Sequence, residues 1–287
     1  MSHMFSWNGA LTADAVEEVI VKFQDPKWDS NVLLPPEQRH LGRPSFPESD
    51  VLDSSSRGER TVKNLKLQKA LIVSGETTVS YACKRMATRG VDYVLLTDDD
   101  SLLCGIFTAN DLAFRVLAEA RMPDQTKLSK VMTRNPVFVF SDSTTIDALQ
   151  KMAQGLFRHL PVIENGKVTA VVNNKGNNVT ASLCLRVATV LASDPVSVAA
   201  ERMRELRVNF VIIMDGNKVE GILTSKDLLI RVVAQNLLPE LTFVEKVMTP
   251  NPECATMDTT IPEALRMMHF RKFTHLPVVD KGGLYFL

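Results

Sequence analysis

The chain has 287 residues, of which 45% are hydrophobic, and its 33 basic side chains balance 33 acidic ones. This length suits two domains of ordinary size, and the balanced charge gives no electrostatic sign of binding to nucleic acid or to a membrane surface. Apolar runs of about five residues are far shorter than the roughly 20 residues of a membrane-spanning helix. No signal peptide is evident and the four cysteines are scattered, so we expect a cytoplasmic protein with reduced thiols.

Residues 1–60 differ in composition from the rest of the chain. Thr12 to Phe23 fits one amphipathic helix, with apolar side chains at i, i+3, i+4 and i+7. Prolines and serines are frequent from residue 25 to 60, which is typical of a linker or a disordered segment. We expect an N-terminal extension here, which Trp7 and Trp28 could equally dock on a folded domain.

Four segments in the remaining chain have the apolar spacing of an amphipathic helix. They begin at Val79, Thr145, Val196 and Ile261, and each has alanine three residues later and methionine seven residues later. Such a stripe predicts a helix that packs on a core. Methionine at this spacing fills core gaps more often than it binds a cofactor.

Short β-rich runs follow the first and third helices. Tyr93–Leu96 and Leu102–Phe107 flank the acidic run Asp98–Asp100, which we interpret as a hairpin turn rather than as a metal site. Phe210–Ile213 and Val219–Leu223 repeat the pattern. A second helix then begins at Thr108 and at Thr224, so each unit reads strand, helix, strand, strand, helix.

The second half of the chain repeats the first at an offset of 116 residues. Segment 131–136, VMTRNP, recurs at 247–252 as VMTPNP, and 16 of the 38 aligned pairs from 131/247 to 168/284 are identical. Upstream, Gly105–Asp111 aligns with Gly221–Asp227. A duplication of this length indicates a repeat architecture.

These motifs resemble those of cystathionine-beta-synthase (CBS) domains. The resemblance rests on the Met-Thr-x-Asn-Pro entry, on His-Leu-Pro-Val at 159–162 and 275–278, and on Gly-apolar-x-Thr-x-x-Asp. It covers roughly residues 61–287 and implies an α/β (α+β) fold of four β-α-β-β-α repeats paired into two Bateman modules. Within the family the chain is similar to plant and fungal proteins with two CBS pairs ahead of a Phox/Bem-type domain, which this sequence does not contain.

We expect module one, with repeats 1 and 2, at 61–178 and module two, with repeats 3 and 4, at 179–287. The alanines of the helix signatures are 66 residues apart within module one and 65 within module two, but only 51 separate repeat 2 from repeat 3. The missing length falls after Val172, so we expect repeat 2 to have lost or shortened its second helix.

Repeat 4 is expected to be incomplete, because the sequence ends at Leu287 as its third strand begins. The apolar side chains that would then lose part of their cover are Ile212, Ile222, Leu265 and Met268.

The candidate ligand site is the Gly-apolar-x-Thr-x-x-Asp motif. Its residues are Gly105, Thr108 and Asp111 in repeat 1 and Gly221, Thr224 and Asp227 in repeat 3. Thr-x-x-Asp at a helix start is also a capping box, in which each side chain bonds the backbone of the other residue. A ligand site would use the glycine for close backbone approach, the helix start for phosphate and the carboxylate for ribose hydroxyls. The CBS resemblance implies binding of adenosine nucleotides.

Cations for the phosphates are expected before the Leu-Pro-Val strand, by resemblance to the gamma subunit of AMP-activated kinase. These positions hold Arg158 and His159 in module one, but Thr274 and His275 in module two. Both histidines could instead be half-buried strand residues bonded to backbone, and Arg115 and Arg231 could form i,i+4 pairs with the motif aspartates. Because Asn173 and Gly176 replace Thr and Asp in repeat 2, we expect at most one site per module, with module one favoured.

The sequence favours a regulatory protein over an enzyme, since it has no Gly-rich phosphate loop, no Gly-x-Ser-x-Gly and no His-Glu-x-x-His. We expect it to sense energy state by binding ATP, ADP or AMP, with or without Mg²⁺ but no cofactor, to modulate a protein partner, and to self-associate. The alternative is a ligand-free CBS scaffold that acts through self-association and protein contacts.

Overall fold

The computed structural model describes residues 61–287 apart from 66, 156, 174–186, 217, 257, 272, 281–282 and 287. The extension at 1–60, with the helix predicted from Thr12 to Phe23, lies outside the described residues. So does Gly176, together with most of the segment in which repeat 2 was expected to lose its second helix. Within the described ranges, no helix is long and apolar enough to cross a membrane.

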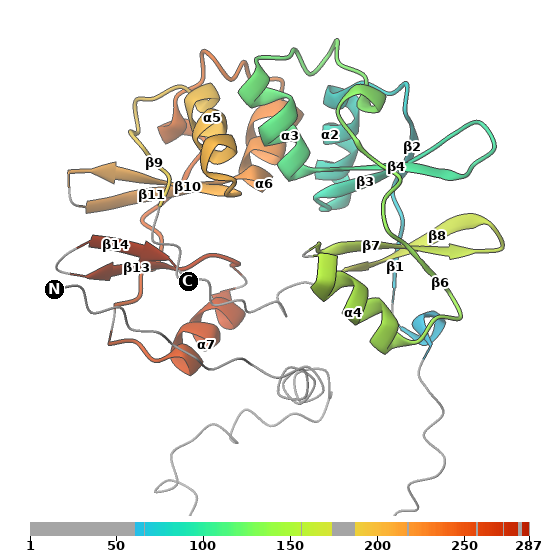
Figure 1. Cartoon of the computed structure of the whole chain (residues 1–287). Coiled ribbons are helices and arrows are strands. Elements are labelled where there is room, and N and C mark those ends of the chain that lie inside the picture. The colour runs from blue at the N-terminus through green and yellow to red at the C-terminus, as the bar shows by residue number, and fades with distance from the viewer. Residues whose placement is uncertain are drawn as a thin grey trace, which may run out of the picture. The chain divides into compact units, whose positions relative to one another are not determined.

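Repeat 1 is a four-stranded sheet in the order β2-β3-β4-β5 that carries two helices (Figure 1). Its strands are β2 (Ile72–Ser74), β3 (Tyr93–Thr97), β4 (Leu103–Thr108) and β5 (Thr133–Arg134), and its helices are α2 (Val79–Arg89) and α3 (Ala109–Arg115), followed by the 3-10 turns η4 (Leu117–Glu119) and η5 (Leu128–Lys130). The run Asp98–Asp100 lies in the hairpin turn between β3 and β4, where the Asp98 carboxylate accepts the N–H of Leu102 at 2.8 Å. This confirms the turn interpretation.

Repeat 3 has the same architecture, in the order β12-β11-β10-β9. Its strands are β9 (Thr189–Val190), β10 (Phe210–Asp215), β11 (Lys218–Thr224) and β12 (Thr249–Pro250). Helix α5 (Val196–Leu206) is regular, but the second helix is broken into α6 (Ser225–Asp227), the π-helical turn η6 (Leu228–Val232) and the 3-10 turn η7 (Val233–Gln235), with η8 (Val244–Lys246) further on.

Among the residues that the structure describes, repeats 2 and 4 each have one long helix. Repeat 2 consists of β6 (Val139–Phe140), α4 (Thr145–Gly155), β7 (His159–Glu164) and β8 (Lys167–Asn173), and the early segments η3 (Val62–Asn64) and β1 (Gln68–Lys69) join it, with β1 antiparallel to β8. Repeat 4 has α7 (Ile261–Arg271) and the hairpin of β13 (Pro277–Asp280) with β14 (Gly283–Phe286). All four long helices begin at the residues predicted from the apolar spacing, and the signature methionines Met86, Met152 and Met203 are fully buried.

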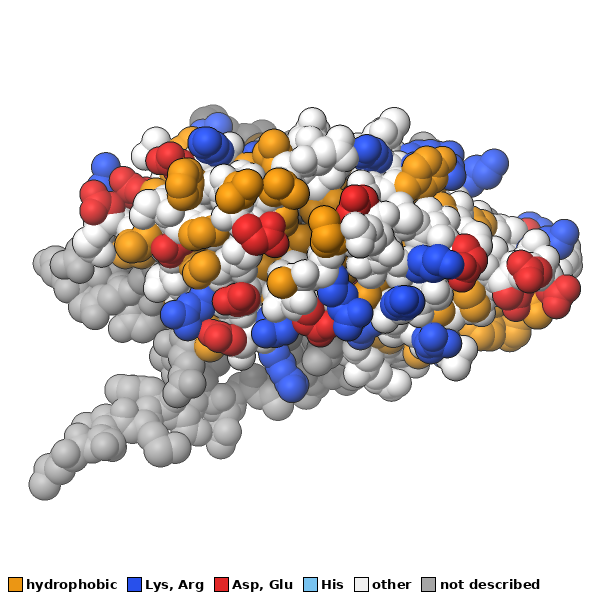
Figure 2. Space-filling view, turned by 90° about the horizontal axis from the view of Figure 1, so that it is seen from above, with side chains coloured by type: hydrophobic (Ala, Val, Ile, Leu, Met, Phe, Trp, Pro, Cys, Tyr) orange, Lys and Arg blue, Asp and Glu red, His pale blue; other side chains and the backbone are white. Residues whose placement is uncertain are grey.

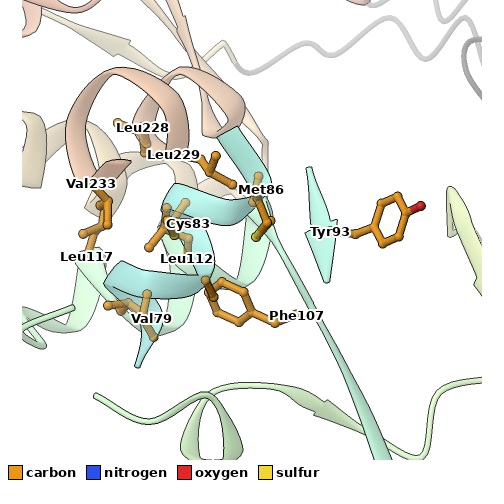
Figure 3. Packing of buried hydrophobic residues seen from close by; sticks show 14 of the residues in the cluster. Val79, Cys83, Met86, Tyr93, Phe107, Leu112, Leu117, Leu228, Leu229 and Val233 are labelled. Carbon is orange, nitrogen blue, oxygen red and sulfur yellow. The ribbon is translucent and has the colours of Figure 1, made fainter. Parts of the chain in front are cut away.

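Repeats 1 and 3 share one hydrophobic core, which joins the two modules. Helix α2 of repeat 1 contacts η6 and η7 of repeat 3, α3 contacts α6 and η6, and α5 contacts α3 and η4. Figure 3 shows Leu228, Leu229 and Val233 of repeat 3 beside Cys83 and Leu112 of repeat 1. The Ser225 hydroxyl also donates to Asn110 Oδ1 at 2.8 Å across this contact. The two modules therefore meet through the helices of their first repeats.

The expected loss of cover in module two is wrong for two of the four side chains. Ile212 is fully buried and Ile222 is 8% exposed, because Phe210 and the partly buried Val187 and Val219 pack around them. Met268 is partly buried against the small core of repeat 4, and the Leu265 side chain lies outside the described part. The expectation did not consider that side chains of repeat 3 itself, such as Phe210 and Val219, bury Ile212 and Ile222.

Candidate functional site

The Thr-x-x-Asp motifs form capping boxes in both repeats. The Asp111 carboxylate Oδ2 accepts the N–H and the hydroxyl of Thr108 at 2.9 and 2.8 Å, and the Asp111 N–H donates to Thr108 Oγ1 at 3.3 Å. Thr224 and Asp227 repeat this arrangement at 2.9, 2.6 and 3.3 Å. The Ala109 N–H donates to Asp92 O at 2.9 Å, so the N–H groups of residues 108, 109 and 111 have partners within the protein.

The second carboxylate oxygen of Asp111 is also engaged. Its Oδ1 lies 3.2 Å from Nη1 of Arg115 and accepts the Thr133 hydroxyl at 3.4 Å. Asp111 is 8% exposed, and burial raises the pKa of its carboxyl although the hydrogen bonds from Thr108 and the charge of Arg115 oppose this. A ribose diol would have to replace Thr133 or Arg115 at Oδ1.

Both arginines that follow the motifs form the predicted i,i+4 pairs. Arg115 pairs with Asp111, and Arg231 Nε lies 3.4 Å from Asp227 Oδ1. Each also donates to the backbone ahead of the Met-Thr entry, Arg115 to Val131 O at 3.1 Å and Arg231 to Val247 O at 2.9 Å. The arginines thus connect each second helix to the segment that precedes the Met-Thr entry.

The two motif glycines make room for methionine side chains. A Cβ added at Gly105 would overlap the side chain of Met132, and one at Gly221 would overlap Met248. The sequence predicted that a ligand would approach these glycines closely. The groups that approach them in the structure are instead the Met132 and Met248 side chains of the Met-Thr entries. This gives Gly105 and Gly221 a packing role.

In module one, Asp92 brings the predicted residues together. Its carboxylate lies 3.8 Å from Nη2 of Arg158 and 3.6 Å from Nε2 of His159. Its carbonyl accepts the Ala109 N–H, and the next residue, Tyr93, is the cross-strand partner of Thr108. Arg158 and His159 therefore converge on this carboxylate, whereas Thr108 bonds Asp111, which faces Thr133 and Arg115.

The junction of module one is charged and closely packed. The ring of Tyr93 points away from the shared core in Figure 3 and lies 4.7 Å from the ring of His159, whose Nδ1 is 2.9 Å from Asn173 Oδ1. Burial tends to raise the pKa of Asp92, but the hydrogen bond and charge of His159 and the charge of Arg158 outweigh it and lower the pKa to about 2. Asp92 is thus the acidic partner of both Arg158 and His159.

The corresponding junction of module two is neutral. His275 Nε2 is 3.1 Å from Asn209 Oδ1, its Nδ1 is 2.9 Å from Thr274 Oγ1, and its ring lies 4.8 Å from that of Phe210. Burial, followed by the charge of Arg158, lowers the pKa of His275 to about 4. The ring nitrogens of both histidines contact side chains, which differs from the backbone bonding considered as the alternative.

Sequence reasoning identified Arg158 and Thr274 but missed Asp92 and Asn209, which complete these junctions. Asp92, Arg158, Asn209 and Thr274 stand at the same position of repeats 1 to 4, directly before Tyr93, His159, Phe210 and His275. An alignment of the four repeats would have shown that this position holds an acid and a base in module one, but an amide and a hydroxyl in module two.

Comparison with known proteins identifies the repeats. The family model of the CBS domain matches residues 62–118, 128–175, 184–234 and 244–285. The CBS domain-containing protein CBSCBSPB2 of Arabidopsis thaliana is 51% identical over 286 residues, which cover 83% of this chain and 53% of the relative. The chain thus spans about half the length of the curated relatives CBSCBSPB2 and CBSCBSPB3.

More distant proteins share the arrangement. Meiotically up-regulated gene 70 protein of Schizosaccharomyces pombe is 28% identical over 313 residues, covering 82% of this chain and 43% of that protein. The crystal structure of protein MJ1225 from Methanocaldococcus jannaschii matches with a TM-score of 0.58 at 13% identity, over 75% of this chain and 90% of that one, which shows the fold alone. With four matched segments that span most of its length, the chain belongs to the CBS domain family.

Proposed function

We propose that this CBS protein is a cytoplasmic, non-enzymatic regulator that binds an adenosine nucleotide in module one and transmits the bound state to a protein partner. The observation that carries the proposal is the charged junction around Asp92. Arg158, whose side chain is 40% exposed, is held there by a loose pair at 3.8 Å. Such pairs are weak, so a phosphate that matches the guanidinium in charge and geometry can replace the carboxylate.

Phosphate binding at Arg158 would also change the protonation of His275 in module two. The charge of Arg158 lowers the pKa of His275, so the two junctions interact electrostatically. An anion on Arg158 would neutralise part of that charge and favour protonation of His275. This supplies a physical route by which ligand in one module alters the other, and competition among ATP, ADP and AMP for it would make the protein an energy sensor.

A ligand-free scaffold remains the second candidate, and a specific observation favours it. The carboxylates of Asp111 and Asp227 and the N–H groups at the start of α3 already have partners within the chain. In a scaffold these groups would serve only as caps and as links between helix and strand.

Thermal unfolding in the presence of ligands separates the two functions. The full chain is melted with ATP, ADP, AMP and S-adenosylmethionine, each with and without Mg²⁺, because a ligand that binds only the native state must raise the melting temperature. A concentration-dependent rise with a phosphorylated ligand, reduced in Arg158→Ala, supports nucleotide binding. Unchanged melting temperatures with every ligand favour the scaffold.

A further inference from the structure

Repeats 1 and 3 build the same backbone between their second helix and the Met-Thr entry, at 120–127 and 236–243. In each segment a buried threonine, Thr126 or Thr242, donates its hydroxyl to the carbonyl four residues earlier at 2.8 Å. The carbonyl of that threonine accepts the first N–H of α2 or α5 at 2.9 Å. Because the anchors coincide, the outward side chains of the two segments can be compared position by position.

In repeat 1 this surface is charged. Arg121 Nη2 lies 2.8 Å from Glu119 Oε2, and Lys127 pairs with Glu76. Both pairs are exposed, so they serve solubility more than stability. The segment in repeat 1 is therefore an ordinary solvated surface.

In repeat 3 the same positions are apolar. Repeat 3 has Leu237, Leu238, Leu241 and Phe243 where repeat 1 has Arg121, Met122, Gln125 and Lys127. The acids of the two ion pairs are replaced as well, Glu119 by Gln235 and Glu76 by Ser193. The backbone conformation does not require apolar side chains at these positions, since repeat 1 adopts it with polar residues at three of the four.

These four side chains, which we call the repeat 3 patch, are open to solvent. Leu237, Leu238, Leu241 and Phe243 are 41%, 54%, 73% and 44% exposed. From above, hydrophobic side chains gather over the half of the molecule that carries α5 (Figure 2). A contiguous exposed patch of a few hundred Å² usually marks an interaction site.

We propose that the repeat 3 patch is the interface through which two copies of this chain associate about a twofold axis. The exposed Glu240, Glu245 and Lys246 lie at its margin, and the Lys246 ammonium lies 5.7 Å from the centroid of the Phe243 ring. In a twofold contact the same surface faces itself, so an acid of one copy can meet a base of the other. The patch is thus complementary in charge to a second copy of itself.

The size of the patch fits the centre of such an interface. A standard interface buries roughly 800 Å² per partner, which exceeds the few hundred Å² that four partly exposed side chains offer. The patch therefore forms an apolar core, and Glu240 and Lys246 belong to the polar rim around it. The association does not depend on nucleotide binding in module one.

The test replaces the patch with the residues of repeat 1. In the full chain, Leu237→Arg/Leu241→Gln/Phe243→Lys installs side chains that the same backbone carries in repeat 1, so the fold is preserved. Sedimentation velocity over a concentration series measures the dimer dissociation constant. Wild type is expected to form a dimer, and the triple variant to weaken it by at least about tenfold, because core residues dominate interface energies.

A matched control introduces the same three residues elsewhere. Leu102→Arg/Ile146→Gln/Phe140→Lys changes side chains that are 49%, 53% and 55% exposed in repeats 1 and 2, and it should dimerise like wild type. The single change Leu241→Gln, at the most exposed patch position, should weaken the dimer on its own. A wild-type chain that stays monomeric at every concentration overturns the proposal, as does an unchanged dissociation constant in the triple variant.

Discussion

Asp92 and Arg158 occupy the same position in repeats 1 and 2 and face each other with Oδ2 and Nη2 3.8 Å apart. In repeats 3 and 4 the same position holds Asn209 and Thr274. The pseudo-symmetry of the CBS pair thus places an acid against a base in module one, whereas in module two the neutral Asn209 and Thr274 both contact His275. We therefore expect the two junctions to respond differently to anions and to pH.

The Arg158→Ala variant tests the phosphate contact. We expect a loss of about 1.5–3 kcal/mol in binding free energy for ATP or ADP, the value of a hydrogen bond to a charged group, and a much smaller loss for adenosine. Isothermal titration calorimetry measures both. Arg202→Ala removes an exposed arginine that pairs with Glu205 and serves as control. Equal losses for ATP and adenosine would show that Arg158 is structural.

The Asp111→Ala variant separates the cap from the ribose contact. Loss of the cap should cost about 0.5–2 kcal/mol of unfolding free energy, and Asp227→Ala should cost the same because the two boxes match. If Asp111 also binds ribose, nucleotide affinity falls by about 1–3 kcal/mol in Asp111→Ala and less in Asp227→Ala. If the folded Asp111→Ala variant binds nucleotide with wild-type affinity, Asp111 only caps the helix and does not contact ribose.

The Asp92→Asn variant tests the charged junction through acid stability. The pKa of Asp92 is lowered from 3.8 to about 2, so its carboxylate stabilises the fold above the usual pKa, and this stabilisation is lost as pH falls from about 4 to 2. The shift corresponds to about 2 kcal/mol. Urea unfolding across this range should show a steeper loss in wild type than in Asp92→Asn. Parallel pH profiles would contradict the assignment.

Local patterns predicted the helices but not the junctions. The apolar spacing from Val79 and the Thr108 capping signal lie within one element, so the sequence displays them directly. The partner of Asp92 is 66 residues away, and within its own repeat Asp92 is one polar residue before a strand. The core shared by repeats 1 and 3 could not be predicted either, because an apolar helix face does not show which other helix it packs on.

His275 should make module two sensitive to mild acid. Its pKa in the folded chain is about 4, below the usual 6.5. Between these two pH values the side chain is protonated in the unfolded chain but neutral in the folded chain. Stability therefore falls as pH drops from about 6.5 to 4. His275→Gln should reduce the fall in melting temperature between pH 7 and pH 5, whereas His269→Gln, which changes an exposed histidine, should leave it unchanged. The same fall in all three proteins would refute this.

Gly105 and Met132 should be energetically coupled. Alanine at Gly105 would place a Cβ in the space of the Met132 side chain, with its Cγ only 3.1 Å away. Overpacking of this kind costs about 1–3 kcal/mol, so Gly105→Ala should lower the unfolding free energy by that amount. In Gly105→Ala/Met132→Ala the extra methyl occupies vacated space, so the double variant should lose less than the sum of the two single changes.

The same cycle at Gly221 and Met248 provides an independent replicate in repeat 3, because a Cβ there meets Met248 in the same way. Nucleotide affinity, measured on each variant, distinguishes packing from ligand approach. If Gly105 only accommodates Met132, the double variant loses less stability than the sum of the single changes and binds nucleotide like wild type. If the glycine instead lets a ligand reach the backbone, Gly105→Ala weakens binding whether or not Met132 is present. Additive stability losses at both sites would disprove the packing role.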